Sequence, residues 1–361
     1  MKLAVNAIPL LGPMTGVGKY TYEISRRLNG INTSFYYGFY SKKLITKKIE
    51  INKNSFLKRA VKRLLSKAPK LYDEKFDVYF EPNFVINENI KAKKRIATIH
   101  DFSFMIKEWH PKERVEFFEK NFWKNIKLAD EIIVVSEFVK HETLKYLDFK
   151  EENIHVIYNG VDHDVFKKYP EHNLIKIKEK FNLPDDFILF VGSIEPRKNL
   201  LNFLKAYDML SSSTKNDFPL ILAGFSGWNN NEIMDLIDKN SKFIRYLGYI
   251  ETDELAKLYN LASIFVYPSL YEGFGLPPLE AMACGTPVLV SNRASMPEVC
   301  QNYASYCNPQ QPDDIKYQLE NLINDSQLRN KLSSEGIEYT KNFDWDKSAS
   351  KHLQLFKETV C

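Results

Sequence analysis

Short apolar runs alternate with longer segments of mixed polarity along almost the whole chain. The short runs, rich in Val, Ile, Phe and Tyr, predict buried strands, and the segments between them predict helices. In the first half of the chain, strands are expected at residues 2–6, 33–39, 76–80, 95–99, 131–135 and 153–157, and helices at 18–28, 113–128 and 136–147. In the second half, strands are expected at residues 187–191, 220–223, 243–247, 263–267 and 288–291, and helices at 313–324, 326–340 and after Trp345. Strands and helices that alternate in this way predict an α/β fold with doubly wound parallel sheets.

A junction near the middle of the chain divides it into two parts. The length of 361 residues is sufficient for two domains of ordinary size. A polar segment that follows Asn159-Gly-Val-Asp162 and contains Phe166 and Pro170 interrupts the alternation. We therefore expect one α/β domain at residues 1–167 and a second, similar domain at residues 168–343.

Composition narrows the class of protein. With 44% hydrophobic and 27% charged residues the chain is typical of a globular protein, and no stretch approaches the ~18 consecutive apolar residues of a transmembrane helix. The four cysteines lack a CxxC spacing, which indicates neither a zinc site nor a disulfide framework and favours a cytoplasmic location. Asp162-His163-Asp164 resembles a metal-binding pair but lies in the junction, so we expect no metal there.

The net charge of +4 conceals an asymmetry between the two halves. Residues 1–167 carry 30 Lys and Arg against 21 Asp and Glu, a net +9, whereas the remaining residues carry 20 against 25, a net −5. Much of the excess lies between Lys53 and Lys70, where apolar residues at helical spacing alternate with basic ones. Such a helix suits an anionic membrane surface, and it equally suits an ordinary helix packed on its own domain. No base-reading module is recognisable, so a nucleic-acid partner is not expected.

Unusual residues gather at the carboxyl ends of the expected strands, the edge at which open α/β sheets bind ligands. These residues are Gly16, Gly18, His100 and Asp101 in the first domain, and Ser193, Tyr249 and the stretch between Glu272 and Glu280 in the second. Their positions predict a ligand cleft between two domains that face each other.

The stretch at residues 269–285 predicts a strand end, a Gly-Phe-Gly turn and then a short helix that begins near Pro277 and ends at Gly285. Free backbone N–H groups at the start of such a helix can hold an anion. Glu272 and Glu280, on either side of the turn, could accept hydrogen bonds from hydroxyls that flank a bound phosphate, as in a nucleotide-sugar. The alternative is an ordinary glycine-rich turn with two solvated carboxylates.

Arg197 and Lys198 are adjacent at the expected start of a helix, where the helix dipole makes positive charge unfavourable. A diphosphate held by both side chains would explain why they cluster, and a solvated surface pair is the alternative.

Two further features lie in the first domain. His100 is either a substrate contact or a structural histidine that Asp101 orients. The segment with Gly16 and Gly18 is not a P-loop, because Tyr20 replaces the Ser or Thr that would hold magnesium. It is either a loop that lets the backbone approach a substrate or a structural turn.

Together these residues resemble the retaining family-4 glycosyltransferases of the GT-B fold, especially bacterial mannosyltransferases that build surface polysaccharides. The resemblance extends over almost the whole chain. The matching segments are Glu272-Gly-Phe-Gly-Leu-Pro-Pro-Leu-Glu280, similar to the family's E-x7-E motif, and Val191-Gly-Ser-Ile-Glu-Pro-Arg-Lys-Asn-Leu200, Thr98-Ile-His-Asp101, Val135-Ser136 and Asn159-Gly-Val-Asp162. The resemblance implies two Rossmann-like domains that face each other across a cleft, and a last helix at residues 344–361 that crosses back to the first domain.

The resemblance also implies roles for individual residues. Arg197 and Lys198 would neutralise the departing diphosphate of the donor, Glu272 would contact the transferred sugar, and Glu280 would hold the ribose. The other implied contacts are Gly273, Phe274, Gly275, Leu276, Ser193 and Tyr249 to the donor, His100 to the sugar, and Gly16, Gly18 and Asp101 on the acceptor side. Many relatives have an Arg at the position of Ser193, so Arg197 would supply the guanidinium here.

Transfer in this family retains the anomeric configuration and needs no metal or cofactor. We therefore expect a hexosyltransferase that moves mannose from GDP-mannose to a glycan or polyprenyl-linked acceptor, in the cytoplasm or on the inner face of the cell membrane. Two alternatives stay open. A nucleotide-sugar epimerase of the same fold is disfavoured by the E-x7-E motif with Arg197-Lys198, and a catalytically inactive nucleotide-sugar-binding protein would require the loss of cleft residues.

Overall fold

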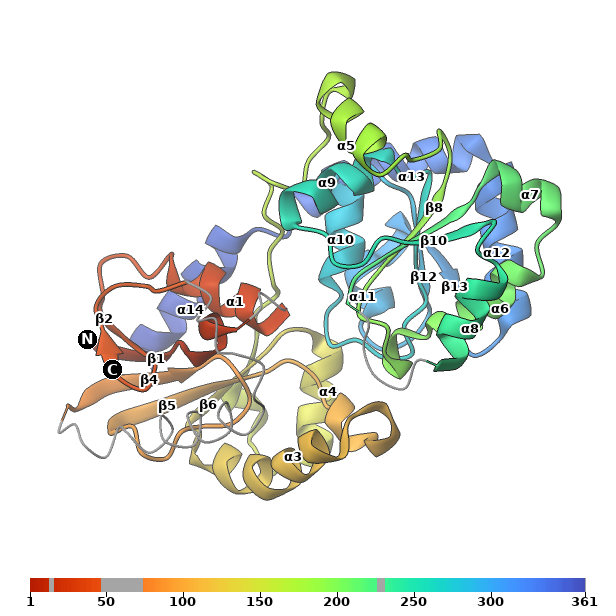
Figure 1. Ribbon diagram of the computed structural model, residues 1–361. Coiled ribbons are helices and arrows are strands. Elements are labelled where there is room, and N and C mark those ends of the chain that lie inside the picture. Colours follow the sequence, from red (N-terminus) through yellow and green to blue (C-terminus); the bar gives the residue numbers. More distant parts are fainter. Residues whose placement is uncertain (13–15, 47–73, 226–230, 361) are drawn as a thin grey trace. The chain divides into compact units, whose positions relative to one another are not determined.

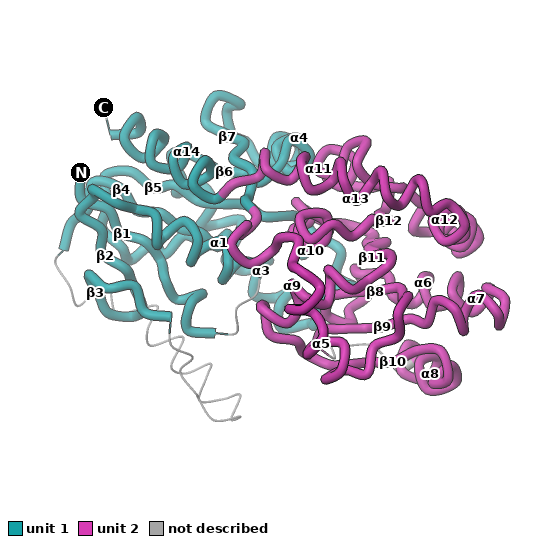
Figure 2. Tube along the Cα trace, turned by 90° about the horizontal axis from the view of Figure 1, so that it is seen from above, with its two compact units in different colours: residues 1–160, 345–361 teal, residues 161–344 magenta. Residues whose placement is uncertain are grey.

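The structure is a computed structural model that describes residues 1–12, 16–46, 74–225 and 231–360 (Figure 1). The chain divides into two compact units (Figure 2): unit 1 comprises Met1–Gly160 and Trp345–Cys361, and unit 2 comprises Val161–Asp344. The first division precedes the expected boundary after residue 167, because Val161 forms a parallel bridge with Asp344 and its N–H donates to Phe343 O at 3.1 Å. The basic segment between Lys53 and Lys70 lies outside the described residues.

Unit 1 contains a seven-stranded sheet in the order β3-β2-β1-β4-β5-β6-β7. Its strands are β1 (Lys2–Asn6), β2 (Asn32–Tyr36), β3 (Tyr40–Ser41), β4 (Phe76–Glu81), β5 (Ala92–Ile99), β6 (Glu131–Val134) and β7 (Ile154–Val156). All neighbouring pairs are parallel except β2 and β3. The strand order reverses direction between β1 and β4, which makes this the topological switch point of unit 1.

The strand expected at residues 33–39 is shorter than predicted. The chain turns back after Tyr36, and Tyr36 pairs with Tyr40 in an antiparallel hairpin. Gly38 has a φ of 102°, a left-handed backbone conformation that glycine adopts without steric cost, so it permits the turn. The aromatic residues on both sides of Gly38 hid this turn in the hydrophobic pattern.

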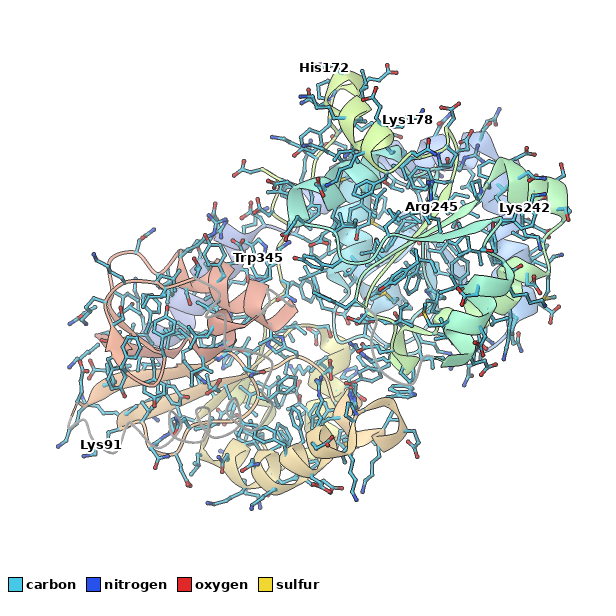
Figure 3. The ribbon with its side chains drawn as sticks, viewed as in Figure 1. Lys91, His172, Lys178, Lys242, Arg245 and Trp345 are labelled. Atoms are coloured by element: carbon cyan, nitrogen blue, oxygen red, sulfur yellow. The ribbon has the colours of Figure 1, made fainter. Side chains whose placement is uncertain are left out.

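Among the described residues of unit 1, the α-helices are α1 (Gly16–Ser25), α3 (Lys112–Asn125), α4 (Glu137–Tyr146) and α14 (Trp345–Glu358). Trp345, labelled in Figure 3, is 1% exposed and begins α14. The Tyr20 hydroxyl on α1 lies 2.6 Å from His352 Nε2 on α14 and 2.8 Å from Thr98 Oγ1 on β5. A buried polar contact therefore joins the last helix of the chain to the first helix and the sheet of unit 1.

Unit 2 contains a six-stranded parallel sheet in the order β10-β9-β8-β11-β12-β13. Its strands are β8 (Ile188–Val191), β9 (Leu220–Ala223), β10 (Ile244–Tyr246), β11 (Ile264–Tyr267), β12 (Val288–Ser291) and β13 (Ser305–Cys307). This is the Rossmann strand order, with its switch point between β8 and β11. The sequence pattern missed β13, because Ser305-Tyr-Cys is short and lacks a β-branched residue.

The helices of unit 2 are α5 (Ile175–Lys180), α6 (Leu200–Asp208), α7 (Ser212–Asp217), α8 (Asn231–Lys239), α9 (Thr252–Leu261), α10 (Leu276–Ala283), α11 (Met296–Cys300), α12 (Pro312–Asn324) and α13 (Ser326–Thr340). One hydrophobic core joins alternate residues of β8, β9 and β11 to the apolar faces of α6, α8 and α12. Because these central strands are buried along their length, their carboxyl ends are fixed, and the loops that follow them start from rigid positions.

Candidate active site

The loops that leave the two sides of the unit 2 switch point are tied together. After β8 the chain forms a 3-10 turn at Pro196–Lys198, and Asn199 ends this turn with a left-handed φ of 59°. The Asn199 side-chain amide donates to Pro268 O at 3.0 Å, directly after β11, and to Pro309 O at 2.6 Å. Leu270 N in turn donates to Arg197 O at 2.9 Å. The turn that carries Arg197 is therefore held against the loop that leads to Glu272.

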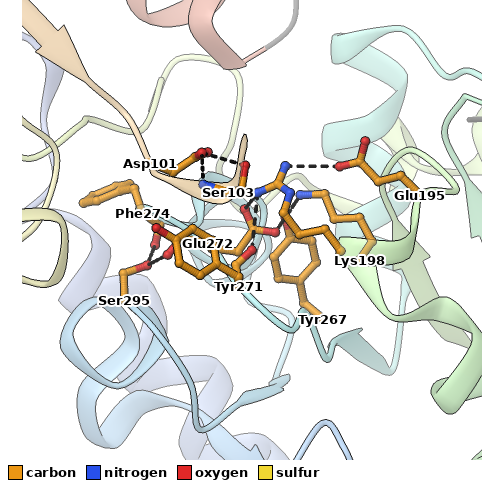
Figure 4. A network of polar contacts seen from close by, with 10 residues as sticks. Asp101, Ser103, Glu195, Lys198, Tyr267, Tyr271, Glu272, Phe274 and Ser295 are labelled. Carbon is orange, nitrogen blue, oxygen red and sulfur yellow. Dashed lines mark hydrogen bonds and ion pairs between the residues drawn. The ribbon is translucent and has the colours of Figure 1, made fainter. Parts of the chain in front are cut away.

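Glu272 pairs with both predicted cations in this part of unit 2 (Figure 4). Its Oε2 lies 2.9 Å from Arg197 Nη1 and its Oε1 lies 2.7 Å from Lys198 Nζ. Arg197 Nη2 also donates to Glu195 Oε1 at 3.1 Å. The Tyr267 hydroxyl lies 3.0 Å from Glu272 Oε1 and 2.5 Å from Lys198 Nζ. Glu272 is only 6% exposed, so these contacts are sheltered from water.

The charges of this cluster control its protonation. Burial raises the pKa of Glu272, but the positive charges of Arg197 and Lys198 outweigh burial and lower that pKa to about 2. Burial lowers the pKa of Lys198, and the Glu272 carboxylate offsets part of this effect. Glu272 is therefore ionised at neutral pH. The adjacent Arg197 and Lys198 are not a solvated surface pair, since both side chains are largely buried.

The glycine turn before α10 has the form that the sequence predicts. Gly275 precedes the helix with a φ of 101°, prolines occupy its first turn, and Gly285 follows its end with a φ of 79°. Ser295 Oγ lies 2.9 Å from Glu272 O and 3.0 Å from Phe274 O, so its hydroxyl can donate to either carbonyl. These contacts tie two carbonyl groups of the turn to the start of α11. Glu280 lies within α10 and is 7% exposed.

A pair of exposed aromatic rings follows the next two strands of unit 2. Phe225, after β9, stacks on Tyr249, after β10, with ring centroids 4.6 Å apart and planes at 23°. Both rings are nearly half exposed, at 46% and 44%. Gly224 N donates to Gly248 O at 2.8 Å, and a Cβ at Gly224 would lie 2.0 Å from Gly192 O. The close backbone packing explains why residue 224 must be a glycine. Ser193 directly follows Gly192.

In unit 1, the structure gives His100 a defined protonation. Its Nε2 lies 2.8 Å from Pro82 O, and since a carbonyl only accepts, Nε2 carries the proton. Burial lowers the pKa of His100, so the ring is neutral at pH 7 and Nδ1 is an acceptor. The ring also packs edge-on against Tyr20, with centroids 4.9 Å apart. Asp101 Oδ1 accepts from Ser103 N at 2.9 Å and from Ser103 Oγ at 2.7 Å.

Gly16 and Gly18 lie in the first turn of α1, so this helix begins two residues before the expected start at residue 18, and Gly16 is helical. Tyr20 and Ile24 are buried on one face of this helix. Thr21 Oγ1 donates to Val17 O, one turn earlier, at 2.8 Å. Residues 13–15, which precede them, lie outside the described part of the chain.

The structure therefore brings Arg197, Lys198 and Glu272 into direct contact, while His100, Asp101, Gly16 and Gly18 belong to the other unit. Sequence reasoning missed Tyr267, Ser295 and Asn199. A signal existed for Tyr267, which is a polar-tipped residue at the carboxyl end of a central strand. Ser295 comes to the site only through the fold, because it is far from Glu272 in sequence.

Comparison with known proteins identifies the family. The model for glycosyl transferases group 1 matches residues 172–339, and the model for glycosyltransferase family 4 matches residues 14–165. The chain is 31% identical to the O-antigen chain mannosyltransferase B of Escherichia coli, over 99% of this chain and 100% of that protein. The chain belongs to glycosyltransferase family 4. Membership implies a nucleotide-sugar donor and a glycan acceptor for this transferase.

Two further similarities agree with this assignment. The transferase is 33% identical to the O-antigen chain mannosyltransferase RfbU of Salmonella typhimurium over 62% of this chain and 58% of that protein. Its structure is similar to that of sucrose-phosphate synthase from Thermosynechococcus elongatus, with a TM-score of 0.76, 18% identity and 99% and 98% of the two chains covered. The latter confirms the GT-B fold that the sequence predicts.

None of the helices placed by the structure is long and apolar enough to cross a membrane. Nor does the described part of the chain hold three or more His, Cys, Asp or Glu side chains placed to bind a metal ion.

Proposed function

We propose that this transferase moves mannose from GDP-mannose to a glycan or polyprenyl-linked saccharide acceptor with retention of the anomeric configuration. The mannose assignment is supported by the relatives at 31% and 33% identity, both of which are named O-antigen chain mannosyltransferases. The glycan acceptor follows from the same relatives. The guanine base is the part of the donor that rests on the resemblance alone.

The single observation that carries the proposal is the charged cluster at the unit 2 switch point, where Arg197 and Lys198 lie on the same turn. Breaking the bond between sugar and diphosphate leaves negative charge on the phosphate oxygens, and fixed positive groups in a water-poor site stabilise that charge. The N–H groups at the start of α10, beside Gly275, add to this effect. These groups can replace a metal ion, so the proposed transfer is metal-independent.

Lys198 retains the means to contact a phosphate. An ammonium group has three N–H donors, and two of those on Lys198 point to Tyr267 and Glu272. A third can reach a phosphate oxygen. In the proposed complex Glu272 aligns the two cations and its remaining lone pairs accept from a hydroxyl of the transferred sugar.

The other roles in the proposal follow the chemistry of each side chain. Glu280 accepts hydrogen bonds from the ribose hydroxyls, and Tyr249 lies flat against the base. His100, neutral with an acceptor at Nδ1, contacts a hydroxyl of the sugar. We propose a cytoplasmic location, with peripheral attachment to the inner face of the cell membrane.

The proposal is tested with a panel of GDP-, UDP- and dTDP-sugars, scored by thermal shift and by nucleotide release with a mannan-type acceptor. We expect the largest shift and the fastest release with GDP-mannose, and an α-linked product by NMR. A preference for another donor would overturn the mannose assignment. Release of a free epimer without acceptor would favour an epimerase, and binding of no donor would overturn the transferase proposal as a whole.

Two variants connect the proposal to its residues. Lys198→Ala and Glu272→Ala are both expected to abolish transfer while the protein stays folded. Measurement of far-UV circular dichroism beside nucleotide release separates loss of chemistry from loss of fold. Full activity in either variant would refute the role proposed for that residue.

A further inference from the structure

Tyr267 is the last residue of β11 and is 1% exposed, yet its hydroxyl touches two charged groups of the cluster. The phenol oxygen lies 2.5 Å from Lys198 Nζ and 3.0 Å from Glu272 Oε1, and those two atoms lie 2.7 Å from each other. An ammonium group only donates and an ionised carboxylate only accepts. The hydroxyl therefore accepts from Lys198 and donates to Glu272, and its proton position is fixed.

The ring of Tyr267 is held as firmly as its hydroxyl. It belongs to a central strand buried on both faces, and it packs against Phe265 with centroids 5.8 Å apart. Burial raises the pKa of the Tyr267 phenol well above its ordinary value, so the hydroxyl keeps its proton at neutral pH. Lys198, by contrast, has a long flexible side chain that requires a fixed acceptor to occupy one position.

We propose that the Tyr267 hydroxyl is a positioning group for catalysis: it holds the Lys198 ammonium against Glu272, in the orientation that meets the leaving diphosphate. This inference rests on the proposed transferase function. Tyr267 acts through Lys198 and does not itself contact the donor. Preorganised charge stabilises a transition state because it needs no reorganisation during the reaction, and a buried hydroxyl supplies that preorganisation.

The proposal also predicts a change in the titration of Lys198. The titratable and charged groups that face its ammonium are Glu195, Arg197, Tyr267 and Glu272. Removal of the Tyr267 hydroxyl removes an acceptor and leaves the other three groups in place. The pKa of Lys198 should therefore fall, because its charged form loses a hydrogen bond.

The test compares Tyr267→Phe with Tyr259→Phe. Tyr259 is a second buried tyrosine of unit 2, and within the described structure its hydroxyl has no hydrogen-bond partner. Both substitutions remove one buried hydroxyl and keep the ring. We expect Tyr267→Phe to lower kcat by about tenfold or more with less than a threefold change in donor KM, and to move the alkaline limb of the pH profile to lower pH. Tyr259→Phe should match the wild type in kcat, in donor KM and in the position of the alkaline limb.

A second readout does not depend on turnover. With 13Cε-labelled lysine, the NMR signal of Lys198 is assigned by its loss in Lys198→Arg and then titrated with pH. Its midpoint should fall in Tyr267→Phe and stay in place in Tyr259→Phe. If the wild type turned over no donor, the proposed function would fail, whereas this titration would still test the contact between Tyr267 and Lys198.

A double variant tests whether Tyr267 acts through Lys198. Tyr267→Phe added to Lys198→Arg should lower kcat by less than it does in the wild type, because the group that it positions has already been changed. Equal and independent losses would contradict the proposal. An unchanged kcat in folded Tyr267→Phe would also overturn it, whatever the titration shows.

Discussion

The switch points of the two units place a buried glutamate in similar topology but in opposite electrostatic settings. In unit 2, Glu272 lies between Arg197 and Lys198, and their charges lower its pKa to about 2 despite burial. In unit 1, Glu81 ends β4 and is fully buried, and burial raises its pKa to about 8 although three neutral groups donate to it. Those donors are Asn6 Nδ2, Tyr79 Oη and Asn83 N.

The difference in protonation between Glu272 and Glu81 indicates which kind of ligand group each switch point can bind. Neutral hydrogen bonds do not compensate for burial of a carboxylate, whereas two cations at hydrogen-bond distance do. Unit 2 therefore keeps separated charges at its switch point, as electrostatic stabilisation of a diphosphate requires. Unit 1 presents neutral groups there, Glu81 and the nearby neutral His100, which suit the binding of uncharged hydroxyls and the stability of the sheet.

The largest expected effect comes from removing the charge of Glu272. In Glu272→Gln, Arg197 and Lys198 lose the anion that aligns them, and we expect kcat/KM for donor and acceptor to fall by about 10²–10³-fold. The matched substitution in unit 1, Glu81→Gln, replaces a carboxyl that is already protonated and should keep most of the activity at pH 7. Initial rates of nucleotide release measure both. Comparable losses of activity in the two variants would show that the loss in Glu272→Gln does not come from removal of the charge.

Stability at different pH values gives the next largest effect. The pKa of Glu81 is about 8 in the folded protein against an ordinary value of 4.5, so between these pH values the folded state binds more protons than the unfolded state. Stability should therefore fall as the pH rises from 4.5 to 8. One unit of pKa corresponds to about 1.4 kcal/mol, so the loss amounts to a few kcal/mol by pH 8.

Glu81→Gln cannot ionise, and it should remove this part of the pH dependence. Urea unfolding at pH 5, 6, 7 and 8 measures it, and the difference between wild type and variant cancels the titration of all other groups. Parallel curves for the two proteins would mean that the hydrogen bonds from Asn6 and Tyr79 stabilise the carboxylate enough to keep it ionised.

The sequence predicted more of unit 2 than of unit 1, and the reason lies in how each site is built. Arg197, Lys198 and Glu272 lie in the loops that follow central strands, so strand pattern and motif together predicted them at one edge. The contacts of His100 and Asp101 within unit 1 depend on the path of loops that no periodic pattern describes. The hairpin at Gly38 and the helical position of Gly16 were missed for the same reason.

Tyr267 and Ser295 show a second limit of sequence reasoning. Their importance lies in the positions of their hydroxyl groups. The Tyr267 hydroxyl lies 2.5 Å from the Lys198 ammonium, and the Ser295 hydroxyl lies within 3.0 Å of two carbonyl oxygens of the glycine turn. In sequence, a tyrosine at the end of a strand or a serine before a short helix is equally compatible with a role in packing alone.

Two glycines extend the comparison to the backbone. Gly275 has a φ of 101°, and a Cβ there would lie 2.2 Å from Met296 Cε. We expect Gly275→Ala to destabilise the protein by about 2 kcal/mol, because the strain of a left-handed alanine adds to a clash. Gly16 has open space around its Cβ position and lies in α1, so Gly16→Ala should be neutral or stabilising by up to about 1 kcal/mol.

Thermal unfolding monitored by circular dichroism measures both glycine variants. Restoration of most of the lost stability in the double variant Gly275→Ala/Met296→Ala would assign the cost to the clash, and no restoration would assign it to the backbone. A stable Gly16→Ala that has lost transfer would support the predicted role of this segment on the acceptor side. A stable and fully active Gly16→Ala would refute that role.

The smallest expected effect concerns two exposed aromatic rings, each of which follows a strand of its own unit. Tyr249 follows β10 in unit 2, and Phe39 follows β2 in unit 1, and they are 44% and 47% exposed. Only Tyr249 belongs to a stack of two exposed rings, with Phe225, on the unit that we propose binds the donor. A planar base could extend that stack, and an aromatic contact of this kind contributes about 0.5–1.5 kcal/mol.

Tyr249→Ala should therefore raise the donor KM by about threefold to tenfold and leave kcat almost unchanged, since the base is remote from the bond that breaks. Phe39→Ala removes a ring of similar exposure and should change neither constant. Steady-state kinetics at saturating acceptor measures both, and Tyr249→Phe, which keeps the ring and loses only the hydroxyl, should behave as the wild type. If Tyr249→Phe were as impaired as Tyr249→Ala, the contact with Glu251, which lies 3.4 Å from the hydroxyl, would matter more than stacking. If Phe39→Ala raised the donor KM equally, the two strand ends would not differ in function, and the assignment of the base to unit 2 would be wrong.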